Sequence, residues 1–184
     1  MLNNSSNVST GKPKVTGAIF AAVAGTAIPS DATTPLTDDY KNLGYIHEDG
    51  VTNAVETDSE SIKAWGGDTV DETQTSYDET FQFIAIETNE ATLKEYYGPD
   101  NVEISATAMT VKHTSEELPE HPWAIETVLK GGRVQRTVIP KGKITERGEV
   151  VFKDDEAIGY SMTIKALPDA DGATAYTHIA TPAT

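Results

Sequence analysis

Apolar and polar residues alternate along much of the chain, and the pattern is most regular near its C-terminal end. Every second position over residues 158–166 is apolar: Ile158, Tyr160, Met162, Ile164 and Ala166. This period of two is typical of a β-strand with one buried face. Residues 123–130 alternate in the same way, and Gly131-Gly132 predicts a turn into another strand over residues 133–139. Pro140 is expected to end that strand, because proline cannot donate a backbone hydrogen bond.

Residues 89–97 predict a helix. Asn89 suits the N-cap, Gly98 suits the left-handed position after the last turn, and Pro99 prevents continuation. One face of this helix carries Leu93, Tyr96 and Tyr97. We therefore expect the helix to lie against a sheet.

The remaining pattern indicates loops, turns and one irregular strand. Residues 102–111 alternate with a slip in parity at Met109, as a β-bulge would produce. Residues 25–39 hold two prolines and many small polar residues, which predicts a long irregular connection. Asp49-Gly50 is typical of a tight hairpin turn.

These elements predict a mainly β fold, a β-sandwich or barrel with one flanking α-helix. A chain of 184 residues fits one domain. We expect an extended N-terminal arm (residues 1–14), a core (15–169) that contains the helix, and a small-residue C-terminal tail (170–184). Residues 15–24 are either a first strand or a segment that docks on another surface.

Residues 69–80 alternate like a strand but have no apolar face. One face reads Val70, Glu72, Gln74, Ser76 and Asp78, and the other reads Asp71, Thr73, Thr75, Tyr77 and Glu79. An isolated polar hairpin is marginally stable in water, whereas neighbouring chains can complete a sheet at an open edge. The segment is therefore either a disordered acidic loop or a strand that neighbouring subunits complete, with one side facing an aqueous channel. In the second case we expect it to be ordered only in the polymer.

The excess of acidic over basic residues limits the kinds of partner that the chain is expected to bind. There are 29 acidic against 14 basic side chains, a net charge of -15. This favours a soluble, self-repelling surface without general affinity for nucleic acid. It also fits a surface that lets a polyanion pass, or a salt-adapted host. The absence of cysteine excludes disulfides and cysteine zinc sites and fits a reducing cytoplasm.

Targeting signals are weak. The apolar run at residues 18–24 is shorter than the ~20 residues that span a membrane. It also lacks the basic start of a signal peptide. Glycosylation sequons at Asn3, Asn4 and Asn7 matter only in a secretory pathway. We expect no membrane association.

Catalytic, cofactor and metal motifs are not recognisable. The four histidines have no metal-ligand spacing, and a turn explains His47 and Asp49 better than a metal site does. Asp169 to Gly172 matches only a fragment of a calcium loop. Trp65 and Trp123 are interpreted as one core anchor and one interface residue, with a sugar-stacking platform as the alternative. The inventory predicts a protein that packs and associates rather than an enzyme, and that uses no cofactor.

Four segments together resemble major tail tube proteins of long-tailed bacteriophages, of the siphophage type. They read GKPKVTGAIFAAVAGTAIPSDATTPL, YKNLGYIHEDGVTN, IKAWGGDTV and TVIPKGKITERGEVVFKDDEAIGYSMTIKALPD, and the likeness spans residues 11–169. The resemblance implies six copies in a ring and rings stacked into a tube. The tube encloses a tape measure protein and later conducts DNA, without binding it specifically. Tail terminator and baseplate or distal tail proteins are further partners, and assembly in the host cytoplasm yields a virion component.

The resemblance also assigns regions to roles. The arm at residues 1–14 and a long early loop at residues 50–67 would bridge rings, the loop through Asp58, Lys63, Trp65, Gly66 and Gly67. A strand facing the lumen or a neighbouring subunit would contain Thr69, Asp71, Thr73, Thr75, Arg133 and Arg136. The two arginines suit an acidic bore poorly and are instead expected to pair with acidic residues of a neighbour.

A second hypothesis is a β-sandwich binding module on a virion or cell surface, of the carbohydrate-binding or adhesin-like class. It rests on the aromatic residues Trp65, Tyr96, Tyr97 and Trp123, if they are exposed.

Overall fold

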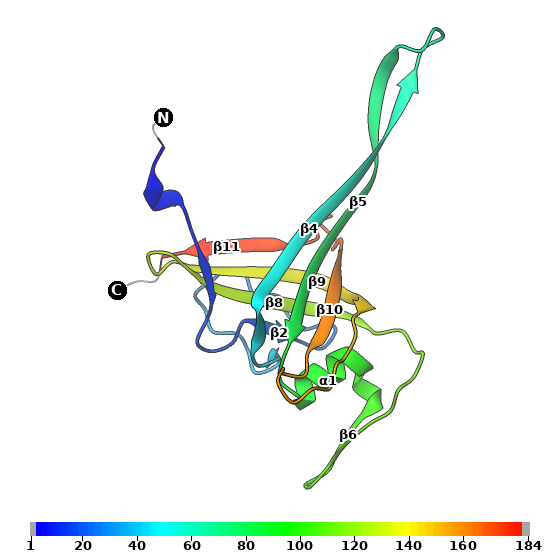
Figure 1. Ribbon diagram of the computed structural model, residues 1–184. Coiled ribbons are helices and arrows are strands. Elements are labelled where there is room, and N and C mark those ends of the chain that lie inside the picture. The colour runs from blue at the N-terminus through cyan, green and yellow to red at the C-terminus, as the bar shows by residue number, and fades with distance from the viewer. Residues whose placement is uncertain (1–2, 182–184) are drawn as a thin grey trace.

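The computed structural model describes residues 3–181 and is mainly β (Figure 1). The strands are β1 (Gly11–Pro13), β2 (Ile19–Ala21), β3 (Lys41–Asn42), β4 (Ile46–Lys63), β5 (Thr69–Ala85), β6 (Val102–Ile104), β7 (Met109–Val111), β8 (Glu120–Leu129), β9 (Val134–Arg147), β10 (Tyr160–Leu167) and β11 (Tyr176–Ala180). Helix α1 (Glu90–Tyr97) and 3₁₀ turns at Ser5–Asn7 and Pro99–Asn101 complete the elements. Residues 1–2 and 182–184, parts of the expected arm and tail, lie outside the described residues.

The main sheet has the order β3-β2-β8-β9-β10-β5-β4, with β1 also paired to β8 and β11 to β9. Strand β9 changes partner along its length: it pairs with β11 up to Val138 and with β10 from Lys141 onward. The sheet formed in this way surrounds a sandwich-like core. The expected end of the strand at Pro140 is wrong, because this proline lies between the two partners, where its missing N–H breaks no ladder.

The core is centred on Trp123, as the interpretation of a core anchor requires. Its side chain is fully buried, and its ring lies edge-on to Phe83, with the centroids 6.3 Å apart. Its Nε1 donates to the carbonyl of Gly142 at 3.2 Å. A Cβ at Gly142 would lie 2.4 Å from the indole, so glycine is required where β9 passes this ring.

Helix α1 forms where the sequence predicts it. The Asn89 side chain accepts a hydrogen bond from the Thr92 backbone, and Gly98 ends the helix with a φ of 104°. Leu93 and Tyr96 are buried against the sheet, and Tyr96 Oη donates to the Gly148 carbonyl at 2.5 Å. The helix thus covers one end of the core.

Strands β4 and β5 form a hairpin that projects far from the sheet (Figure 1). Only residues 79–85 of β5 also pair with β10. The long loop expected at residues 50–67 is therefore wrong: most of that segment is strand β4, because it pairs with β5 along nearly its whole length. Asp49-Gly50 is no hairpin turn either. Gly50 has a φ of 72° within a register shift near the start of β4.

Two shorter segments also differ from expectation. Residues 102–111 are a small hairpin, in which β6 pairs with β7, instead of one bulged strand. Strand β11, inside the expected tail, extends the sheet beside β9. Residues 25–39 contain no strand or helix, as predicted. Residues 15–24 contain strand β2, which pairs with β8. The interpretation of this segment as a first strand is therefore confirmed.

Candidate functional site

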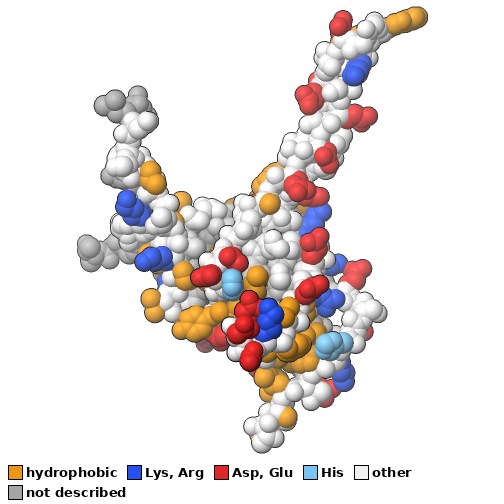
Figure 2. Space-filling view, in the orientation of Figure 1, with side chains coloured by type: hydrophobic (Ala, Val, Ile, Leu, Met, Phe, Trp, Pro, Cys, Tyr) orange, Lys and Arg blue, Asp and Glu red, His pale blue; other side chains and the backbone are white. Residues whose placement is uncertain are grey.

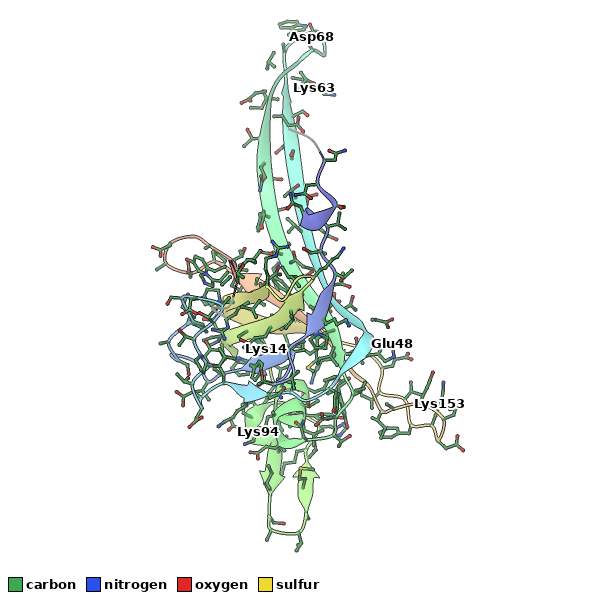
Figure 3. The ribbon with its side chains drawn as sticks, turned by 90° about the vertical axis from the view of Figure 1, so that its left-hand side faces the viewer. Lys14, Glu48, Lys63, Asp68, Lys94 and Lys153 are labelled. Atoms are coloured by element: carbon green, nitrogen blue, oxygen red, sulfur yellow. The ribbon has the colours of Figure 1, made fainter. Side chains whose placement is uncertain are left out.

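The outer part of the hairpin, residues 56–78, is called the hairpin extension below. Every residue in it except Ser76 is exposed. It contains seven acidic residues and one basic residue, Lys63, so its formal net charge is -6. Figure 2 shows the acidic side chains spaced along it, and Figure 3 labels Lys63 and Asp68 near its tip. No apolar core contributes to this part of the fold.

Backbone pairing and a few polar contacts hold the extension together. Its register shifts twice, after Asp58 and after Ile62. At the first shift, Ser76 Oγ donates to the Asp58 carboxylate at 3.0 Å. The tip closes with a hydrogen bond from the Ala64 amide to the Asp68 carbonyl at 2.8 Å. Gly66 and Gly67, both with positive φ, make this turn.

The solvent face at the base of the hairpin is polar and acidic. A hollow of about 250 Å³ on this face is lined by Thr52, Ala54, Glu56, Asp78, Thr80, Gln82, Thr145, Glu146 and Thr163. These residues come from β4, β5, β9 and β10, so the face is one continuous sheet surface. Lys165 Nζ contacts the Asp78 carboxylate at 2.6 Å and offsets part of the charge. Such a face stays hydrated and offers no apolar contact.

The outer edge of β4 is open. Among the described strands, β4 is the end of the main sheet and pairs only with β5. Beyond residue 78, towards the tip, β5 also has a free outer edge. Open edges expose unpaired backbone donors and acceptors, which are suited to pairing with another chain.

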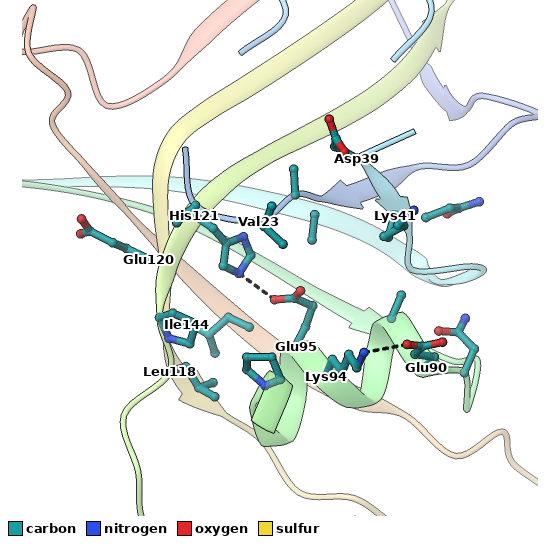
Figure 4. A pocket seen from close by; sticks show the side chains of 18 residues that line it. Val23, Asp39, Lys41, Glu90, Lys94, Glu95, Leu118, Glu120, His121 and Ile144 are labelled. Atoms are coloured by element: carbon teal, nitrogen blue, oxygen red, sulfur yellow. Dashed lines mark hydrogen bonds and ion pairs between the residues drawn. The ribbon is translucent and has the colours of Figure 1, made fainter. Parts of the chain in front are cut away.

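A groove of about 790 Å³ lies beside α1 (Figure 4). Its apolar lining includes Ala21, Ala22, Val23, Leu118 and Ile144. Inside it, His121 Nε2 lies 2.8 Å from the Glu95 carboxylate, and the histidine side chain is 8% exposed. Burial alone lowers the pKa of His121, but the hydrogen bond and charge of Glu95 outweigh that effect and raise the pKa above its ordinary value.

The geometry therefore combines an open sheet edge, an acidic polar face and a projecting hairpin, which are features of an assembly subunit. A family model described as phage tail tube protein matches residues 1–183. The chain belongs to the phage tail tube protein family. It is thus a structural subunit of a phage tail, in a family that is not known for enzymatic activity. No curated protein matches the chain.

In this tail tube protein, Arg136 is not where the sequence analysis placed it. Its side chain is 1% exposed, forms an ion pair with Glu126, and donates to the carbonyls of Asp31 and Thr34 at 2.8 and 2.9 Å. Lys14 Nζ contacts the same glutamate at 3.0 Å. The expected pairing of Arg136 with a neighbouring chain is wrong, because the cross-strand residue on β8 is Glu126 of its own chain. The arginine instead clamps the loop of residues 25–39.

Arg133 lies beside the Gly131-Gly132 turn, which forms as predicted. It is partly exposed, and its Nη2 donates to Ser9 Oγ at 2.8 Å. It therefore contacts the N-terminal arm of its own chain.

The remaining predicted tail tube residues all lie on the hairpin extension. They are Asp58, Lys63, Trp65, Gly66, Gly67, Thr69, Asp71, Thr73 and Thr75. The residues expected to bridge rings and the residues expected to face the lumen thus lie in one hairpin. The register shifts, however, place the expected lumen residues on different faces of that hairpin. Asp71 and Thr73 lie opposite Ile62 and Glu60, whereas Thr69 lies opposite Lys63, which points to the other face.

The aromatic platform of the alternative hypothesis is not formed. Trp123 and Tyr96 are buried, and Tyr97 packs partly buried against the core. Only Trp65 among those four is fully exposed, at 106%. The carbohydrate-binding alternative therefore loses the surface on which it rested.

Neither a membrane-spanning helix nor a metal-binding cluster is found within residues 3–181. No helix in this range is long and apolar enough to cross a membrane. Within the same range, no cluster of three or more histidine, aspartate or glutamate side chains is arranged to hold a metal ion.

Proposed function

We propose that six copies of this chain close into a ring, and that rings stack into a tube whose channel conducts DNA into the host. The tube first encloses the tape measure protein and is bounded by tail terminator and baseplate or distal tail proteins. Assembly takes place in the host cytoplasm. The observation that carries this proposal is the open edge of β4 on a hairpin that continues beyond its own core.

Ring closure uses that edge. The outer edge of this 18-residue strand exposes a row of backbone donors and acceptors, which readily pairs with a neighbouring strand. When each copy adds its sheet to the next, the sheets close into one barrel and no edge is left.

The lumen wall is the polar face at the base of the hairpin. Glu56, Asp78 and Glu146 carry negative charge there, and the threonines among them keep the surface hydrated. DNA binds tightly where basic side chains neutralise its phosphates. An acidic wall repels phosphate, so DNA moves through without specific binding.

The hairpin extension bridges successive rings. Strand β4 runs eight residues from Glu56 to Lys63, which at about 3.3 Å per residue carries the tip roughly 25 Å beyond the sheet. We assign Asp58, Lys63 and Trp65 to this contact, with the N-terminal arm as a second bridge.

Negative-stain electron microscopy of the purified protein tests the proposal, at high concentration and with a tail-initiation complex present. We expect stacked rings or tubes. A variant in which Asn-Gly replaces residues 56–78 should fold, because the deletion removes no core contact, but should form no tubes, because it lacks the bridge between rings. A control with Phe152→Ala, an exposed residue outside the hairpin, should assemble normally. Strictly monomeric wild-type protein under both conditions would contradict the proposal.

A further inference from the structure

The tip of the hairpin extension presents one large apolar side chain to solvent. Trp65 is 106% exposed and lies in a turn closed by backbone hydrogen bonds. Its indole has no contact with the core of its own chain. Figure 2 shows a hydrophobic side chain at the end of the hairpin. Tryptophan is among the residues most enriched at interface hot spots, where it fills a pocket of the partner.

The apolar groove beside α1 lies at the other end of the molecule. Figure 3 labels Asp68 at the hairpin tip and Lys94, which lines the groove, at the opposite end. A projection at one end and a recess at the other are surfaces of a head-to-tail contact. A head-to-tail contact between identical chains either closes into a ring or, where its rotation does not close, propagates into an open polymer, and a contact between opposite ends of stacked subunits is of the second kind.

We propose that Trp65 of one copy inserts into the groove beside α1 of a second copy. This inference rests on the proposed function, because stacked rings bring the tip of one subunit to the far end of another. It adds the receiving surface, which neither the family nor the open sheet edge identifies.

The charges around the two surfaces fit this occupant. Lys63 is the single basic residue of the extension and forms no ion pair within residues 3–181. Asp39 and Glu120 line the groove, and their side chains form no ion pair in that range either. Of the other groove charges, Lys94 pairs with Glu90 and Glu95 with His121 (Figure 4). Lys41, the remaining one, donates from Nζ to the Asp38 carbonyl at 2.6 Å. Lys63, two residues from Trp65, can therefore meet a free carboxylate at the rim.

Cysteine cross-linking tests the contact directly, because the chain has no cysteine of its own. Ala64→Cys places a thiol beside Trp65, and Val23→Cys places one at the exposed rim of the groove. The two single variants are mixed, assembled into tubes and oxidised. We expect a disulfide-linked dimer on denaturing gels that contains one copy of each variant. Neither variant alone should give it, nor should Ala64→Cys mixed with Ile179→Cys, an exposed position on β11.

A second measurement does not depend on engineered thiols. Trp65→Ala should raise the protein concentration needed for tube formation at least about tenfold, while the circular dichroism spectrum stays unchanged. Lys63→Glu should weaken assembly, and Glu120→Lys should restore it in that background. Phe152→Ala is the matched exposed control.

The outcomes separate this inference from the proposed function. Wild-type tubes without the mixed dimer, together with Trp65→Ala assembling at the wild-type concentration, would overturn the groove contact and leave the tube intact. Cross-linking of Ala64→Cys to a different protein of the tail would assign the tip another occupant and also overturn it. Absence of tubes from wild-type protein would overturn both proposals.

Discussion

Charged residues occur both in the hairpin extension and in the domain beneath it, but their surroundings differ. In the domain, Glu126 is buried between Arg136 and Lys14, and His121 is buried against Glu95. Within the described residues, no buried side-chain nitrogen or oxygen lacks a hydrogen-bond partner. In the extension, the carboxylates lie in solvent around a single lysine. The domain satisfies its polar groups internally, whereas the extension leaves them available.

This difference separates folding from assembly. A substitution in the domain removes one partner of a buried contact and changes the free energy of unfolding. A substitution in the extension removes a group that touches little in its own chain, so it changes association instead.

The largest effect is expected at the buried clamp. Arg136→Ala leaves Glu126 buried with only Lys14 as its charged partner and removes two hydrogen bonds to the loop of residues 25–39. We expect a loss of about 3–5 kcal/mol in the free energy of unfolding, measured by urea denaturation. Arg133→Ala, at the partly exposed turn, should cost less than about 0.5 kcal/mol. Equal losses of stability for the two variants would contradict the buried ion pair described for Arg136.

A smaller loss is expected where β9 passes the core. Gly142→Ala places a Cβ 2.4 Å from the Trp123 indole and 2.8 Å from Ile164. Overpacking of this kind costs about 1–3 kcal/mol. Gly11→Ala, whose nearest neighbour would be 3.9 Å away, serves as the control in the same denaturation experiment. A stability for Gly142→Ala equal to that of the control would contradict the packing described.

The contact between His121 and Glu95 predicts a pH dependence. Because the pKa of folded His121 is raised, the contact stabilises fully below the unfolded value of about 6.5, and this stabilisation is lost as pH rises through the folded pKa. His121→Gln should therefore lower the melting temperature more at pH 5.5 than at pH 8.5. The expected cost at the lower pH is about 1–2 kcal/mol. Glu95→Gln should abolish the same pH dependence, and an equal deficit at both pH values would refute the assignment.

The smallest effect on folding is expected at the tip. Trp65→Ala should change the free energy of unfolding of the monomer by less than about 0.5 kcal/mol, because the indole makes no core contact. Thermal denaturation of dilute protein measures this change. A loss above about 1 kcal/mol would show that Trp65 belongs to the fold of its own chain.

Sequence pattern predicted those parts of the molecule that local rules govern. The helix at α1, the turn at Gly131-Gly132 and the buried face of β10 follow from capping, glycine conformation and alternation. The polar segment of β4 escaped prediction because its strand conformation comes from pairing with β5, and no apolar alternation marks it. Strand β11 is not predicted for a similar reason, since Tyr176–Ala180 shows no clear apolar alternation and pairs with β9.

The position of Arg136 and the groove beside α1 also depend on contacts between segments that are separate in the sequence. The sequence of strand β9 alone predicts an exposed Arg136, because it does not show which residue lies opposite. Glu126 and Arg136 each lie five residues from Gly131, and the observed hairpin register places them opposite each other. A two-residue turn at Gly131-Gly132 would instead place Thr137 opposite Glu126, so the pair follows from the register and not from the turn residues alone. The groove beside α1 could not be predicted, because it forms from segments that are distant along the chain.

The central claim is that the hairpin extension is completed by other copies of the chain. Amide hydrogen exchange on the two halves of β5 tests it within one strand. Residues 81–85 include buried Phe81, Phe83 and Ala85, and residues 69–76 contact no core. In the free protein, we expect the amides of residues 69–76 to exchange at least about tenfold faster than those of residues 81–85, and to become protected in assembled tubes. Equal protection of both halves in the free protein, unchanged on assembly, would contradict the account.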